Sequence, residues 1–209
     1  MKFGILTLAL SVSAFGSIVF NGDFGTGDLT GWTVFTTANG SNGANPLPDV
    51  VSFDTTGAGA SNSAQFNVGD VSFTGLQAGG GLIQLVTLAA GEYNFFANIA
   101  AQDSPLGPNS ELGVFSVLIN GVVEGTNDLG PSNAANAIVL STLGATFSVP
   151  TSATYQLQIM ITRPYTNGIG STPDQYLTDV SIVGSPEPAT FVLGGLGLAG
   201  LALARLRKR

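Results

Sequence analysis

The chain of 209 residues contains no cysteine and no histidine, and only 9% of its residues are charged. Without cysteine it forms no disulfide and offers no thiolate as a nucleophile or metal ligand. Without histidine it lacks the most common general base and transition-metal ligand. These absences remove a required group from most hydrolytic mechanisms. The sequence therefore predicts a protein that is not an enzyme.

Carboxylates are the remaining catalytic option. A glycosidase needs two of them about 5 to 9.5 Å apart. The acidic residues of this chain are scattered among predicted turns, and no strand carries a cluster of them. We therefore expect no catalytic residue and no required cofactor.

Positive charge is nearly absent from the middle of the chain. Five of the six basic residues lie at the two ends, which leaves Arg163 as the only cation between them. Twelve acidic residues accompany it, so this central part has a formal charge of −11. Such a field repels phosphate backbones. We expect no nucleic-acid partner.

The first twenty residues, MKFGILTLALSVSAFGSIVF, combine Lys2, an apolar run and then small residues. This pattern is typical of a secretory signal peptide, and cleavage after Ala14 or Gly16 fits the small-residue rule. The competing interpretation is a buried N-terminal strand. We predict a signal peptide over residues 1–16.

At the other end, residues 189–204 form an uncharged apolar run that includes four glycines. As a helix it would cover about 24 Å, short of the roughly 30 Å of a hydrocarbon core. Glycines disfavour the alternative, a buried helix in a water-soluble core. We predict a single transmembrane helix whose C-terminus is held in the cytoplasm by a basic tail, formed by Arg205, Arg207, Lys208 and Arg209.

Two prolines flank a glutamate just before this run. Pro186 and Pro188 bar a continuous helix and keep Glu187 in an extended, accessible segment. The motif, the apolar run and the terminal basic cluster together resemble a PEP-CTERM sorting signal over residues 185–209. The resemblance implies recognition and cleavage by an exosortase, a transpeptidase-like membrane protein of Gram-negative bacteria that make exopolysaccharide. Pro186, Glu187 and Pro188 are then recognition residues of a substrate.

Between these ends, apolar residues alternate with a period of two, as in half-buried strands. In ATYQLQIMIT (153–162) and GEYNFFANIA (91–100), apolar side chains face one way and mainly polar ones the other. Further strands are predicted in LTGWTVFT, DVVSFD, SAQFNV, GLIQLVTL, LGVFSVLIN, around ATFSV and in QYLTDVSIV. Asn120-Gly121 predicts a hairpin turn because both residues accept a positive φ.

These strands predict an all-β domain over residues 17–184, an antiparallel β-sandwich. The segments NGDFGTGDLTGWTV, LIQLVTLAAGEYNFFANI, FSVLINGVV and YLTDVSIV resemble carbohydrate-binding-module-like and galactose-binding-like jelly rolls. That resemblance implies a jelly-roll topology and places Trp32 in the core. The alternative for Trp32 is a platform on which a sugar stacks.

Asp23 and Asp179 lie where such folds bring the first and last strands together, which makes them candidate ligands of a structural calcium ion. Relatives commonly read NGDFE, whereas Gly25 follows Phe24 here, so one expected carboxylate is missing. The competing interpretation is a pair of aspartates that cap turns.

The function expected from these features is that of an exported protein. It would pass the inner membrane, be anchored there transiently, and then reach the cell surface or medium with a structural or adhesive role in exopolysaccharide or biofilm. The alternative is a carbohydrate-binding module protein that recognises exopolysaccharide. The loops TTANGSNGANPLPD and AAQDSPLGPNSELG favour this alternative because they are rich in Asn, Asp and Gly, but neither contains the Trp or Tyr on which a sugar usually stacks.

Overall fold

The computed structural model describes residues 17–167 and 172–185. The predicted signal peptide, the motif at 186–188, the predicted helix at 189–204 and the basic tail lie outside these residues. Within the described part, no helical segment has the length and hydropathy that a membrane span requires.

The described residues form twelve β-strands, and the longest run for eleven or twelve residues. They are β1 (Thr33–Thr36), β2 (Gly40–Ser41), β3 (Asp49–Phe53), β4 (Ser61–Phe66), β5 (Gly69–Asp70), β6 (Ala78–Leu88), β7 (Gly91–Gln102), β8 (Val114–Ile119), β9 (Val122–Asp128), β10 (Ile138–Val149), β11 (Ala153–Arg163) and β12 (Asp174–Gly184).

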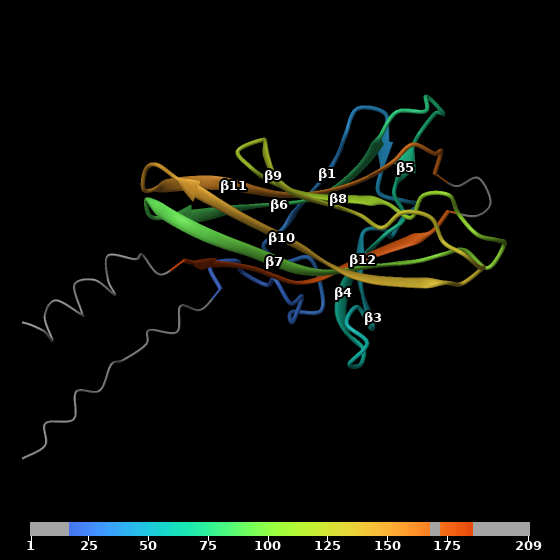
Figure 1. The fold of residues 1–209 in the computed structure, drawn as a ribbon, viewed down its shortest axis with the longest axis horizontal. Helices are drawn as coiled ribbons and strands as arrows, with labels where there is room; N and C mark the ends of the chain where they lie inside the picture. Colours follow the sequence, from blue (N-terminus) through green and yellow to red (C-terminus); the bar gives the residue numbers. More distant parts are fainter. Residues whose placement is uncertain (1–16, 168–171, 186–209) are drawn as a thin grey trace, which may run out of the picture.

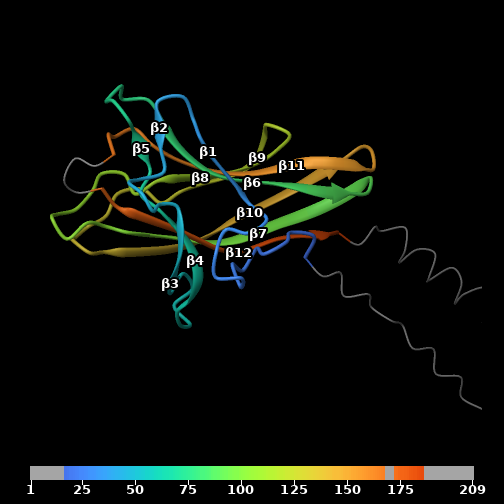
Figure 2. The same ribbon diagram turned by 180° about the vertical axis from the view of Figure 1, so that it is seen from behind.

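Two five-stranded sheets pack face to face in a β-sandwich (Figure 1). The β6 sheet has the order β1-β6-β11-β8-β9, and the β7 sheet has the order β10-β7-β12-β4-β3. All strand pairs in both sheets are antiparallel, and β2 and β5 form a separate small ribbon. The view from behind shows the same two layers (Figure 2). The expected all-β, antiparallel class is confirmed.

Alternation in the sequence determines which side chains enter the space between the sheets. Tyr93, Phe95, Ala97 and Ile99 of β7 are buried there, as predicted. The corresponding residues of β11 meet them from the β6 sheet: Tyr155, Leu157, Ile159 and Ile161. Each large apolar side chain buried in this way stabilises the fold by roughly 1.5–3 kcal/mol. The core is therefore continuous along the sandwich.

The segment before β1 adds to the β7 sheet without forming a named strand. The amide of Ile18 donates to the carbonyl of Ile182 (3.1 Å), and the amide of Val180 donates to the carbonyl of Gly22 (2.8 Å). Trp32 follows this segment and is only 8% exposed. Its Nε1 donates to the carbonyl of Asn21 (3.0 Å). The predicted core position of Trp32 is confirmed.

Several strand predictions differ from the structure in length. The turn at Asn120-Gly121 is confirmed, with φ angles of 48° and 80°. The strand around ATFSV is only the end of β10, a twelve-residue strand. The predicted first strand is shorter, since only its last four residues pair. The two-residue strands β2 and β5 carry no periodic signal and were not predicted.

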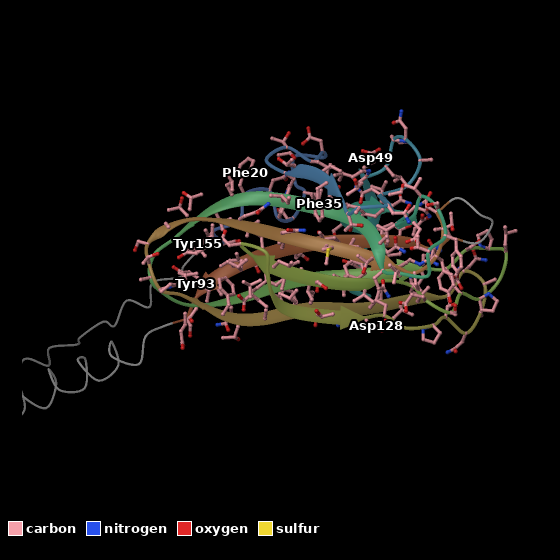
Figure 3. The ribbon with its side chains drawn as sticks, turned by 90° about the horizontal axis from the view of Figure 1, so that it is seen from above. Phe20, Phe35, Asp49, Tyr93, Asp128 and Tyr155 are labelled. Atoms are coloured by element: carbon pink, nitrogen blue, oxygen red, sulfur yellow. The ribbon has the colours of Figure 1, made fainter. Side chains whose placement is uncertain are left out.

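The two ends of the sandwich differ, and we name them by their residues. The tyrosine end comprises residues 89–92, 149–153 and 183–185. The arginine end comprises residues 67–70, 103–113, 128–132, 163–167 and 172–175. Tyr93 and Tyr155 lie near the first end, whereas Asp128 lies toward the second (Figure 3). The described chain begins and ends on the side of the tyrosine end (Figure 1).

Candidate functional site

A pocket of about 530 Å³ opens on the solvent face of the β7 sheet, between the N-terminal segment and strands β7 and β12. Both aspartates singled out in the sequence line it, so residues 156 positions apart in the chain meet at one site. The side chains that define its chemistry are Ser17, Asn21, Asp23, Phe96, Asn98 and Asp179.

A β-bulge in β12 aims Asp179 into this pocket. The register of β12 against β7 shifts between Thr178 and Ser181, and Asp179 has a φ of 54°. Aspartate is one of the few residues that tolerate this left-handed conformation. Asn98 Nδ2 donates to Asp179 Oδ2 at 2.8 Å. The carboxylate is thus held at a fixed position on the strand surface.

Gly22 allows the N-terminal segment to approach the bulge closely. A Cβ atom at this position would lie 2.0 Å from the carbonyl oxygen of Val180. Only glycine therefore permits the hydrogen bond between Val180 and Gly22 that closes one side of the pocket.

Asp23 and Asn21 organise the loop on this side. Asp23 Oδ1 accepts from the amide of Gly25 at 3.0 Å. Asn21 Oδ1 accepts from the amide of Thr26 (3.2 Å), while its Nδ2 donates to the carbonyls of Asp28 and Thr30. Asp23 therefore caps a turn, which the sequence offered as the alternative to a calcium ligand.

The side chains of this pocket fit a calcium ion poorly. Calcium takes six to eight oxygen ligands. Across residues 17–167 and 172–185, no group of three or more Asp or Glu side chains is placed to hold a metal. The amide oxygen of Asn21 already accepts a hydrogen bond, and Asn98 directs its nitrogen at Asp179. A structural calcium ion at Asp23 and Asp179 stays a prediction.

Phe96 supplies an apolar wall to the pocket. Its side chain is 43% exposed, on the face of β7 that otherwise carries Asn94 and Asn98. An exposed aromatic ring beside amides and a carboxylate offers both an apolar face and hydrogen-bonding groups. The sequence placed Phe96 on the polar face but gave it no role. The signal in the sequence that could have identified Phe96 was an aromatic residue on an otherwise mainly polar face.

Arg163 organises the arginine end and is only 1% exposed. Its Nε donates to the carbonyl of Glu111 (2.8 Å), and its two terminal nitrogens donate to the carbonyl of Val68 (3.3 Å) and to Asn109 Oδ1 (2.9 Å). Burial lowers the pKa of Arg163 to about 10, although the charges of Glu111 and Asp103 oppose this. It remains a cation at neutral pH.

Acidic groups lie close to this arginine at the same end of the sandwich. Asp103 is buried and accepts from the amides of Ser104 (2.7 Å) and Asn109 (2.8 Å), and from the hydroxyl of Ser132. Burial raises the pKa of Glu111, and the neighbouring Asp128 raises it further. Glu111 and Asp128 accept from the loop amides of Gly113 (3.1 Å) and Gly130 (2.7 Å), so we assign these acidic residues to the architecture of this end.

The PEP-CTERM protein-sorting motif matches residues 186–208 of the chain. The chain carries a PEP-CTERM sorting signal. The match includes Pro186, Glu187 and Pro188 and most of the basic tail. This motif is the recognition signal of exosortase, a membrane protein, and it indicates export and transient membrane anchoring before cleavage. The matched residues follow directly on the sandwich.

Solved structures resemble the sandwich itself. An apo cyclase from Fischerella sp. has a TM-score of 0.51 at 11% identity, over 81% of this chain and 96% of the other. At this identity the likeness shows the fold alone.

No curated protein sequence matches the chain.

Other structural neighbours are more distant. A CBM61 module in complex with β-1,4-galactotriose has a TM-score of 0.42 at 12% identity, over 81% of this chain and 99% of the module. The enzymatically active domain of a bacteriophage CBA120 tailspike protein has a TM-score of 0.47 at 12% identity, over 81% of this chain. The chain spans only 21% of that tailspike's length.

Proposed function

We propose that this protein has a structural or adhesive role in exopolysaccharide or biofilm after exosortase-type processing delivers it to the cell surface or medium. One observation carries the proposal: a PEP-CTERM signal follows, with no intervening residue, a sandwich that ends at Ser185. The signal accounts for delivery. The body, for which a jelly-roll topology stays our expectation, is then the delivered part.

The chemistry of the body supports a place in a hydrated polymer. Its loops are rich in Asn, Gly and Ser, and its single cation is buried. Its surface therefore presents neutral hydrogen-bonding groups and carboxylates, but no exposed cation among the described residues. Such a surface can hydrogen-bond to polysaccharide hydroxyls. We propose no catalytic activity, in line with the absence of histidine and cysteine.

Deletion of the gene tests this role. We expect the mutant to form biofilm or floc with altered architecture, and the full-length gene to restore it. Complementation with a Glu187→Ala variant should fail, because the protein would not be released. Unaltered architecture in the deletion strain would contradict the proposal.

A second candidate function is carbohydrate recognition in the pocket at Phe96 and Asp179. The exposed ring of Phe96 favours it, because an aromatic face can pack against the C–H face of a sugar. Asp179, held by Asn98, would accept hydrogen bonds from sugar hydroxyls. The size of the pocket, about 530 Å³, suits a small saccharide unit.

Glycan-array binding by the released protein tests this candidate. We expect Phe96→Ala and Asp179→Asn each to weaken binding by about tenfold, which corresponds to about 1.4 kcal/mol. Phe73→Ala is the matched control, because Phe73 is 70% exposed on a loop away from the pocket. A blank array at millimolar sensitivity, or equal losses for Phe73→Ala and Phe96→Ala, would contradict recognition in this pocket.

The same variants test the predicted calcium ion. If Asp179 binds calcium, the melting temperature should fall on chelation in the wild type and not in Asp179→Asn. An unchanged melting temperature on chelation would remove calcium from this site.

A further inference from the structure

The sorting signal begins without a spacer after the folded sandwich. Strand β12 pairs with β7 up to Gly184, which lies opposite Tyr93. The next residue is also fixed, since the amide of Ser185 donates to the carbonyl of Glu92 at 2.8 Å. Pro186, the first residue of the matched motif, is bonded directly to Ser185. The motif therefore starts at the rim of the tyrosine end.

This rim is held in one shape by the two tyrosines. Tyr93 Oη donates to the carbonyl of Ala89 at 2.9 Å, and Tyr155 Oη donates to the carbonyl of Thr151 at 2.8 Å. The two turns are also linked, because the amide of Ala90 donates to Ser152 Oγ at 3.0 Å. Each hydroxyl thus fixes the turn that precedes its own strand. Both tyrosines lie near this end of the sandwich (Figure 3). The tyrosine end is a preformed surface.

The rim carries almost no charge. Glu92 is the only charged residue in 89–92, 149–153 and 183–185, whereas five carboxylates belong to the arginine end: Asp70, Asp103, Glu111, Asp128 and Asp174. The rim carries no Lys or Arg side chain, the groups that anionic lipid headgroups recruit. Low charge instead suits the buried part of a protein–protein contact.

Chain length then brings the processing enzyme close to the rim. Three extended residues span at most about 11 Å. An enzyme that holds the motif at 186–188 must therefore lie beside the residues that surround Ser185. We propose that the tyrosine end is a docking surface for exosortase, which contacts the folded sandwich as well as the sorting motif. This inference rests on the sorting signal and is independent of any glycan role.

Site-specific photo-crosslinking in the full chain tests the surface. A photoreactive amino acid replaces Ala90, which is exposed on the rim, in cells whose exosortase is catalytically inactive. We expect an adduct that contains exosortase. The matched control replaces Ala135, an exposed alanine beyond the arginine end, and should give no such adduct. Equal adducts from both positions, or only lipid adducts from Ala90, would overturn the proposal.

A spacer experiment separates docking from motif recognition. Eight Gly and Ser residues inserted between Ser185 and Pro186 leave both the sandwich and the motif intact. If the rim contributes to binding, release should be several-fold slower at limiting exosortase. An unchanged rate would show that the motif alone suffices. Glu187→Ala should block release with or without the spacer, so a failure of sorting itself is distinguishable from a failure of docking.

Discussion

The two ends of the sandwich are held together by different kinds of interaction. The tyrosine end has short turns, one carboxylate and two hydroxyls that each close a turn. The arginine end has the longer loops, five carboxylates and a buried guanidinium that holds three segments together. The end that leads into the sorting signal has one charged side chain, and the distant end carries five of the twelve acidic residues of the body. Charge thus follows the orientation in which the body is tethered.

The largest effect in this comparison should come from Arg163→Ala. It removes the hydrogen bonds to Glu111, Val68 and Asn109. It also takes the positive charge away from the buried carboxylate of Asp103. We expect a loss of about 3–5 kcal/mol in the free energy of unfolding. Urea unfolding followed by Trp32 fluorescence measures it. Arg163→Lys keeps the positive charge but loses the planar guanidinium group, so its free energy of unfolding should fall by less. A fall below 1 kcal/mol in Arg163→Ala would contradict the role given to this residue.

Smaller losses are expected at the tyrosine end. Tyr93→Phe and Tyr155→Phe each remove one hydrogen bond to a turn carbonyl while the ring stays in the core. Each should lower the free energy of unfolding by about 1 kcal/mol. Tyr165→Phe is the comparison variant, because its hydroxyl contacts Ser110 at an exposed position. If Tyr165→Phe were the most damaging of the three, the account of the rim would be wrong.

The arginine end should also respond to pH through Glu111. Burial raises the pKa of this carboxyl in the folded state above its value of 4.5. The group therefore stabilises the fold when protonated, and this contribution is lost as the pH rises through the folded pKa. Glu111→Gln should remove that loss, so the variant gains stability relative to wild type at pH 7 but not at pH 4. Melting curves at both values measure it, and equal differences would contradict the prediction.

The smallest expected effect lies outside both ends, at Tyr176. Its ring stacks on Phe53 at 3.6 Å, and burial raises its pKa to about 12. Its contribution to stability is present below pH 10 and is lost between about pH 10 and 12. In an absorbance titration of the tyrosines, the ionisation step near pH 12 should be present in the wild type and missing from Tyr176→Phe. A wild-type chain with no step in that range would contradict this assignment.

The alternation of apolar and polar residues predicted those parts of the fold that depend on neighbours in the sequence. Buried positions alternate with more exposed ones over residues 93–99 of β7 and 155–161 of β11, so these buried faces were predicted residue by residue. Strand β10 was underestimated because its first three residues, Ile138, Val139 and Leu140, are all apolar, so the sequence does not alternate there although the burial does. Its length is set by twelve paired residues of β7, a long-range property that no local signal reports.

The prediction of site residues was limited in the same way, because contacts between distant strands leave no local signal. Asp23 and Asp179 were paired in the sequence through a resemblance that joins the first and last strands, and the structure places both at one pocket. Asn98 and Phe96 were missed, because only the register between β7 and β12 brings them beside Asp179. The sequence showed Arg163 to be the only basic residue of the body. Its burial depends on carbonyls from two distant loops, which the sequence does not connect.

The most direct test of this account is the intact mass of the released protein, together with the sequence of its termini. Export and processing at the sorting signal predict a mature chain that has lost its N-terminal segment and ends near Pro186, without the basic tail. The same spectrum reveals any glycan attached to Ser or Thr. A released protein that still ends in Arg209 would contradict the central claim that this sandwich is cut from its anchor beside the tyrosine end.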